Sequence, residues 1–170
     1  MTPQKIVVVN NFLQKNYRYT LTEPVGTHFD PLFTPELTPH EMINLGIFGG
    51  KYETVNSSEF PKEWFTKKSL NSHTKDASKN FFQINASQPL IVWQEKGWIY
   101  HEDPQGWFLW YCRYFMGRRI PYEDARQINR WRAMRRHVAQ IEKNCVRRDQ
   151  LCRRKQRQAL LHWGYDSRKL

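Results

Sequence analysis

Residues 103–119 read DPQGWFLWYCRYFMGRR, and this stretch decides the expected fold. At 100° per residue its six aromatic side chains share one broad face, while three further apolar residues cover most of the opposite side. Asp103 is a good N-cap, Pro104 suits the first helical position, and Gly117 is placed to end the helix in a left-handed turn. A helix that is apolar on nearly every side is a buried one, so we predict that this helix forms the core.

Arg113 is the only charged residue inside this predicted helix. An unpaired buried guanidinium would be costly, so we expect a carboxylate beside it. Asp124, Glu123 and Asp166 are the favoured partners. Asp103 is a weaker candidate, because it would lie more than two turns back on the same helix.

The segment that precedes the core helix contains two short β-prone runs, residues 90–93 and 98–100, on either side of Gln-Glu-Lys-Gly. Two such runs across a glycine-containing turn predict a β-hairpin. A helical fragment is the alternative, because Leu, Gln, Glu and Lys are helix formers.

The segment that follows the core helix predicts two more helices, Tyr122–Asn144 and Arg153–Trp163. Arg126, Arg130 and His137 fall together along one border of the apolar stripe on the longer helix. Five apolar residues of that helix form the stripe that should pack on the core: Ile128, Trp131, Met134, Val138 and Ile141.

The N-terminal part of the chain predicts less regular structure. Ile6–Val9 is an apolar run typical of a strand or of a buried N-terminal arm. Residues 15–38 are rich in Pro and Thr, which predicts an extended surface loop. Thr38 and Glu41 form a capping box that predicts a short helix, and residues 61–68 predict another.

These elements together predict a mainly α protein (α-rich α+β). We expect a single compact helical domain around the buried aromatic helix, with a minor β-hairpin. Residues 1–37 form an N-terminal arm and loop, and residues 38–170 form the helical domain with an arginine-rich C-terminal third. A length of 170 residues with 39% hydrophobic content fits one domain with a sizeable core.

Charge is distributed very unevenly along the chain. The formal net charge is +11, yet residues 1–112 carry a small negative excess and residues 113–170 carry all of the positive one. Only Arg18 among the arginines lies outside the last third. Because arginine pairs with phosphate or carboxylate in a bidentate manner, this asymmetry indicates an anionic partner.

The N-terminus lacks the features of a signal peptide, and no apolar run is long enough to span a membrane. We therefore expect a cytoplasmic protein without a membrane partner. Three cysteines, Cys112, Cys145 and Cys152, favour reduced structural thiols in that compartment. A zinc site and a Cys145–Cys152 bond are the alternatives, and we expect no cofactor.

Four stretches resemble a family of short uncharacterised proteins: LGIFGGKY, DPQGWFLWYCRYFMGRR, DARQINRW and CRRKQRQALLHWGYD. The patterns that carry the resemblance are DPxGWFxWYCRYxxGRR and CRxxQRQALLxW. The resemblance as a whole covers most of the chain beyond Thr38. No activity, cofactor or catalytic residue comes with this resemblance.

General acid–base chemistry has two candidate residues, His137 and Asp124. His137 would be a base with a neutral imidazole, or a third donor to an anion beside Arg126 and Arg130. The competing interpretation is a histidine satisfied at the edge of a helical interface. No motif with a built-in mechanism accompanies either residue.

The leading functional hypothesis is nucleic-acid binding, DNA or RNA, through phosphate contacts from the C-terminal third. One alternative is a small enzyme acting on a phosphorylated or carboxylated substrate held by Arg126, Arg130 and His137. Another is a scaffold for an acidic protein partner. The predicted phosphate or anion contacts are Arg118, Arg119, Arg126, Arg130, Arg132, Arg135, Arg136, His137, Arg153 and Arg157.

Overall fold

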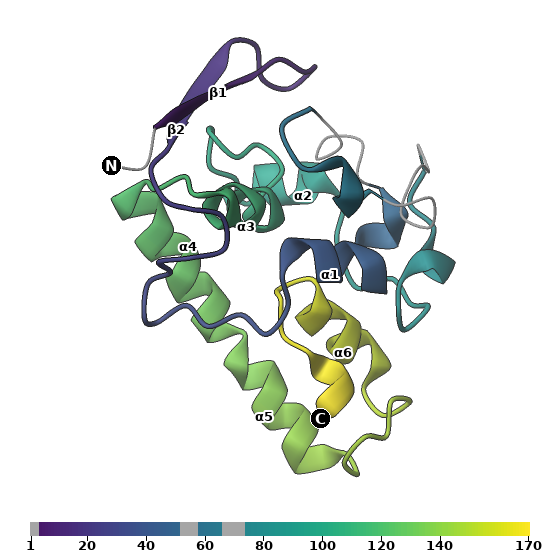
Figure 1. The fold of residues 1–170 in the computed structure, drawn as a ribbon. Coiled ribbons are helices and arrows are strands. Elements are labelled where there is room, and N and C mark those ends of the chain that lie inside the picture. Colours follow the sequence, from purple (N-terminus) through teal and green to yellow (C-terminus); the bar gives the residue numbers. More distant parts are fainter. Residues whose placement is uncertain (1–3, 52–57, 66–73) are drawn as a thin grey trace.

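The computed structural model describes residues 4–51, 58–65 and 74–170. Within these ranges the fold is mainly helical, with one two-stranded antiparallel sheet (Figure 1). No helix there has the length and apolar character needed to cross a membrane. The elements are β1 (Lys5–Val9), β2 (Tyr17–Leu21), α1 (Pro39–Leu45), α2 (Leu90–Glu95), α3 (Trp107–Met116), α4 (Pro121–Ala133), α5 (Arg135–Asn144) and α6 (Arg154–Leu161), with 3-10 turns at Phe48–Gly50, Lys62–Trp64, Ala77–Lys79 and Ser167–Lys169.

Helix α3 is the central element, and eight of its ten residues are buried. The predicted burial is thus confirmed for this part of the helix. The predicted start is wrong, because α3 begins at Trp107 and its N-cap is Gly106 rather than Asp103. Gly106 has φ 89° and ψ −158°, a conformation that needs glycine and stops the helix from extending toward Pro104. Gly117 ends α3 in the left-handed conformation, as predicted.

The β-hairpin lies at the N-terminus and not at residues 90–100. Strands β1 and β2 pair with Val7 opposite Tyr19, which confirms the strand predicted over Ile6–Val9. Residues 90–95 instead form α2, the alternative considered for this segment. Its leucine, glutamine and glutamate favour a helix. After the last turn, the backbone amide of Trp98 donates a hydrogen bond to the carbonyl oxygen of Trp93.

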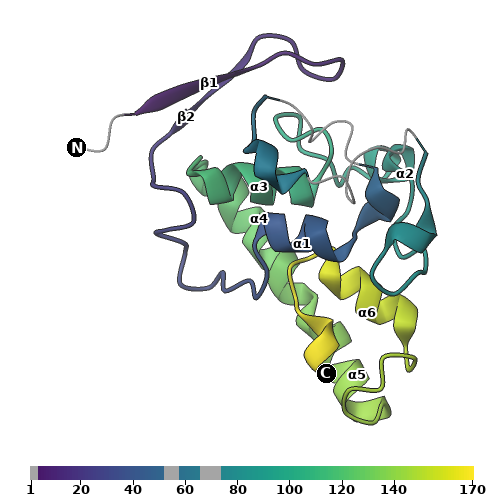
Figure 2. The same cartoon turned by 45° about the vertical axis from the view of Figure 1, so that its right-hand side comes forward.

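The segment between β2 and α1 runs along the helices in an extended form (Figure 2). The backbone amide of Gly26 donates to the carbonyl oxygen of Phe115, and that of Leu37 donates to Gly164 beyond α6. Phe33 is buried among the rings of α3 and α4. At its end the Thr38 capping box forms as predicted, and α1 follows.

Helices α4 and α5 replace the single long helix predicted from Tyr122, with a break at Met134. The apolar stripe faces the core as predicted, since Ile128, Trp131 and Ile141 are buried. The chain then turns back, and α6 packs against α5. Of the short helix predicted over residues 61–68, the 3-10 turn Lys62–Trp64 is described, and residues 66–68 lie outside the described ranges.

A disulfide joins Cys145 to Cys152 across the turn between α5 and α6. The expectation of reduced thiols is therefore wrong for this pair and correct for the buried Cys112. The turn brings the two Cα atoms to 5.8 Å, a separation that suits a disulfide, whereas the sequence argument rested on the odd number of cysteines and the expected compartment. The described residues contain no cluster of side chains suited to a metal ion.

Candidate nucleic-acid interface

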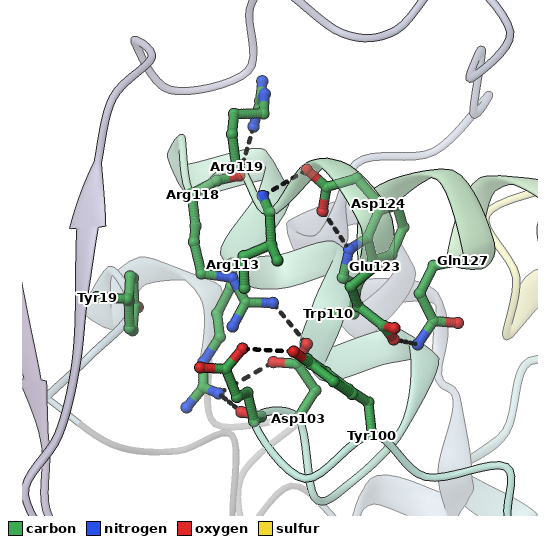
Figure 3. Close-up of polar contacts among 12 residues, drawn as sticks. Tyr19, Tyr100, Asp103, Trp110, Arg113, Arg118, Arg119, Glu123, Asp124 and Gln127 are labelled. Atoms are coloured by element: carbon green, nitrogen blue, oxygen red, sulfur yellow. Dashed lines mark hydrogen bonds and ion pairs between the residues drawn. The ribbon is translucent and has the colours of Figure 1, made fainter.

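The arginine that the sequence places inside the core helix is paired with two carboxylates. Arg113 donates from Nε to Oε1 of Glu59 at 2.6 Å. Its Nη1 donates to Oδ1 of Asp103 at 3.0 Å (Figure 3). The expected carboxylate partner is thus confirmed, but the favoured candidates were the wrong ones. Asp103 reaches Arg113 because it lies in a turn before α3, where its backbone bonds to Tyr100 fold it back over the helix.

Arg118 belongs to the same buried network, so it is not accessible for the phosphate contact predicted from the sequence. Its Nη2 donates to Oδ2 of Asp103 at 2.5 Å, and its Nη1 donates to the hydroxyl of Tyr17 at 3.2 Å. The side chain is 1% exposed. Burial disfavours the charged form, but Asp103 more than offsets this, so the pKa of Arg118 lies above its usual value.

Hairpin tyrosines close this network on the side of β2. Tyr19 donates to Oε1 of Glu59, and burial together with Glu59 raises the pKa of the Tyr19 hydroxyl. Gln14, in the turn between the strands, accepts a hydrogen bond from Nη2 of Arg113. The network therefore links the N-terminal hairpin to α3 and serves the fold.

Three more predicted contacts are also used within the molecule. Arg157 is buried and donates to backbone carbonyl oxygens, including those of Cys152 and Ser167. Arg126 forms a two-bond ion pair with Glu123, so its charge is already neutralised. Arg119 donates to the carbonyl oxygens of Tyr114 and Arg118, which precede it, and to that of Thr27 in the β2–α1 segment. We correct the prediction for Arg157 because it is inaccessible.

The remaining predicted arginines lie toward solvent or a cavity. Arg132, Arg135, Arg136 and Arg153 are exposed, and Arg130 is half-buried. None of them has an ion pair with a carboxylate in the described part of the chain. Further exposed cations on the same helices and turn, without such a pair, are Lys143, Arg147, Arg148, Arg154 and Lys155.

The two candidate catalytic residues have structural partners. Asp124 accepts from the indole Nε1 of Trp110 and from the backbone amide of Ile120, both at 2.8 Å, and burial raises its pKa. His137 contacts the side-chain amide of Gln156 at 2.8 Å, and burial together with Arg136 lowers its pKa. Neither residue lines a cavity described below.

A cavity of about 440 Å³ lies between α2, the start of α3, the end of α4 and the end of α6. A second cavity of about 430 Å³ adjoins it and shares Phe48, Trp93 and Phe108 as lining. We call the two cavities together the aromatic groove. Its aromatic lining consists of Phe12, Phe48, Trp93, Trp98, Trp107, Phe108, His162 and Trp163.

The charged residues of the aromatic groove are all cations. Arg130 and Arg136 line the first cavity, and Lys51 and Lys75 line the second. No Asp or Glu of the described ranges lines either one. The Arg130 guanidinium lies 5.4 Å from the ring centroid of Trp163, and burial, with a smaller effect of a neighbouring arginine, lowers its pKa. The groove therefore presents positive charge beside flat apolar surfaces.

No family model, curated protein or solved structure matches the chain. The resemblance noted from the sequence therefore stays a prediction.

His162 is a neutral hydrogen-bonding group in the wall of the groove. The amide of Gln158 is oriented by two backbone partners, because its Oε1 accepts from Phe82 and its Nε2 donates to Gly46. That Nε2 also lies 3.0 Å from Nε2 of His162, so this ring nitrogen has to accept. Nδ1 then carries the proton, and it has no hydrogen-bond partner among the described residues.

Lowering the pH is expected to destabilise the protein through His162. Burial lowers the pKa of this imidazole from 6.5 to about 3. The contribution to stability is complete above the unfolded pKa and is lost as the pH falls toward the folded one. It amounts to about 2 kcal/mol between pH 7 and pH 5. Urea unfolding of the wild type and of His162→Asn at both pH values measures it; an equal pH dependence in both would contradict the assignment.

The sequence did not identify this groove. Its residues come from segments that are far apart in the chain, and Trp93 and Trp98 were assigned to strands. The sequence offered one signal for the groove. Assigning Leu90–Glu95 to a helix would have placed Trp93 and Trp98 close together, at and just after the end of that short helix. Of the phosphate or anion contacts predicted from the sequence, Arg130 and Arg136 line the groove, whereas His137 and Arg126 do not.

Proposed function

We propose that the protein binds nucleic acid through phosphate contacts from the accessible arginines of α4, α5, the turn after α5 and the start of α6. The observation that carries the proposal is the absence of carboxylate partners for these arginines within the described ranges. A free guanidinium fork matches a phosphate in geometry and charge. Phosphate contacts also supply most of the affinity for nucleic acid without reading its sequence.

The proposed contact set differs from the one taken from the sequence. Arg118 and Arg157 leave it because they are buried, and Arg126 leaves it because Glu123 neutralises it. Arg119 leaves it because it fastens the β2–α1 segment. The proposed phosphate contacts are Arg130, Arg132, Arg135, Arg136, Arg147, Arg148, Arg153 and Arg154.

The proposal retains two finer expectations from the sequence. Residues 38–170 would act as one compact helical domain, with residues 1–37 as its N-terminal arm, and the protein would act in the cytoplasm.

A small anionic ligand is the second candidate, and the half-buried Arg130 in the groove favours it. The cluster of Arg126, Arg130 and His137 does not support an enzyme, because only Arg130 of the three lines the groove.

Affinity for duplex DNA is expected to fall steeply with salt. For about six phosphate contacts, log K against log[salt] should have a slope near −5, because each contact releases bound counterions. Arg132→Gln with Arg147→Gln should make the slope shallower by about two units. Fluorescence anisotropy from low to physiological salt measures both slopes.

The control removes two positive charges from another part of the chain. Lys5→Gln with Lys15→Gln changes the net charge equally but leaves the arginine surface intact, and both lysines are exposed. This variant should retain the wild-type slope. Equal losses in the two variants would mean that net charge alone drives binding, and no binding at low salt would refute the proposed function.

A further inference from the structure

We infer that the aromatic groove holds an unpaired nucleobase together with its phosphate, so that the protein takes single strands in preference to duplexes. This inference rests on the proposed nucleic-acid binding and adds the residues of the aromatic groove, of which Arg130 and Arg136 also belong to the proposed phosphate contacts. The same chemistry is offered by a free nucleotide and by a strand, and the experiment below separates the two sources.

The first argument is the aromatic lining of the groove. Phe48, Trp93 and Phe108 belong to the wall that the two cavities share; the ring centroid of Phe48 lies 6.2 Å from that of Trp93 and 5.6 Å from that of Phe108. Trp98 lies at the rim and is 41% exposed. Every base has a π-face, so the partly exposed rings of Phe48, Trp93 and Trp98 can bind unpaired bases by stacking, whereas Phe108 is buried behind them. A base inside a duplex is already stacked and paired, and cannot enter.

The second argument is the size of each cavity. Volumes of about 440 and 430 Å³ fall in the range of pockets that enclose small organic ligands. A groove of two adjoining cavities therefore has room for a base in one and the neighbouring nucleotide in the other. An intact duplex keeps its bases stacked and paired, so it presents no flat group of this size to the groove.

The third argument is charge. Arg130 and Arg136 on one side, and Lys51 and Lys75 on the other, line a groove that has no described acid. Lys75 has a lowered pKa because of burial and the neighbouring Lys51, so the two lysines repel one another. An anion between these cations would relieve the repulsion and neutralise Arg130.

The fourth argument is the hydrogen-bonding capacity of the wall. The Nδ1–H of His162 is a donor without a described partner, and His162 stays neutral inside the first cavity. The ring contacts Phe48, with centroids 4.4 Å apart. The carbonyl and ring-nitrogen acceptors of a base suit such a donor beside an aromatic surface.

An acidic peptide is the competing occupant, because the groove is basic and apolar groups are exposed at its edge. Phe12 is such a group, at 73% exposure. The observations favour the nucleotide, because stacked aromatic walls select flat rings while carboxylate side chains bring none. The competition arm of the experiment makes the peptide a measurable outcome.

The experiment compares an unstructured oligothymidylate with a duplex of the same strand length, both fluorescently labelled. Trp98→Ala should lower affinity for the single strand about tenfold, the usual effect of losing one stacking ring, and should leave duplex affinity unchanged. Trp98→Phe should keep most of the single-strand affinity, because it keeps a ring.

A matched pair of charge variants locates the phosphate contacts. Arg130→Gln with Lys51→Gln removes two groove cations and should weaken the single strand far more than the duplex. Arg132→Gln with Arg147→Gln removes two surface cations and should weaken both forms alike. Circular dichroism and thermal unfolding of every variant show whether a loss of binding reflects a loss of fold.

Competition identifies the occupant and its source. Thymidine monophosphate should displace the strand while inorganic phosphate at the same concentration does not. Equal affinity for the monophosphate and the strand would identify free nucleotides as the source, and much tighter strand binding would identify the polymer. Displacement by polyglutamate, but not by the monophosphate, would overturn the inference in favour of an acidic peptide.

The two proposals fail in different ways. Binding of single strand and duplex with equal affinity, unchanged by Trp98→Ala, would overturn the groove assignment and leave the arginine surface in place. Absence of binding to either form at low salt would overturn the proposed function and this inference together.

Discussion

Asp103→Asn is expected to lower the free energy of unfolding by about 3–5 kcal/mol, the usual cost of removing one partner from a buried ion pair. Asp103 is fully buried and bonds to both Arg113 and Arg118. Asparagine keeps the shape but not the charge, so two buried guanidinium groups lose a counter-ion. Urea unfolding at pH 7 measures the loss, and the fold itself can be followed by near-ultraviolet circular dichroism.

Glu95→Gln provides the control, because Glu95 is exposed at the end of α2. The free energy of unfolding of this variant should stay within about 0.5 kcal/mol of the wild-type value. A wild-type midpoint for Asp103→Asn would contradict the buried network and would mean that water reaches both arginines.

Trp110→Ala is expected to cost about 3–5 kcal/mol as well, the typical loss for a large core aromatic. Trp110 is 0% exposed, contacts the ring of Phe33 and donates its indole N–H to Asp124 at 2.8 Å. The substitution opens a cavity and leaves a buried carboxylate short of a donor. Such a loss removes a large part of the stability margin of a typical domain.

The neighbouring Trp107→Ala should have a comparable effect, because Trp107 is also buried. Trp98→Ala is the matched control, since Trp98 lies at the rim of the groove and is partly exposed. The free energy of unfolding of Trp98→Ala should differ from the wild-type value by no more than about 0.5 kcal/mol. Equal midpoints for Trp110→Ala and Trp98→Ala would contradict the assignment of Trp110 to the core.

Local patterns in the sequence predicted the elements that depend on local physics. The rings after Gly106 predicted the buried helix, the Thr38 capping box predicted α1, and Gly117 predicted the end of α3. Each of these signals lies within about one turn of the structure that it specifies. The apolar stripe on α4 and α5 was predictable for the same reason, because helical periodicity fixes which side chains share a face.

Contacts between distant segments were not predictable in this way. Nothing near Arg113 indicates that Glu59 is its partner, because the two lie on separate segments joined only by the tertiary fold. The role of Asp103 was predicted wrongly for a different reason. Asp103 has a side chain suited to an N-cap and was assigned as the N-cap of the core helix, but Gly106 moves the N-cap of α3 three residues later. The aromatic groove was missed because the strand assigned to residues 90–93 concealed α2.

The contacts between the N-terminal hairpin and the arginines in and after α3 also determine the order in which parts of the fold can form during synthesis. Gln14 and Tyr17 bond to Arg113 and Arg118, which are about a hundred positions later in the chain. At about 5–20 residues per second, the ribosome needs roughly 5–20 s to cover that distance. A two-stranded hairpin is marginal alone, so β1 and β2 have to wait for α3 before they gain lasting support. The earliest part of the chain is thus among the last to be secured.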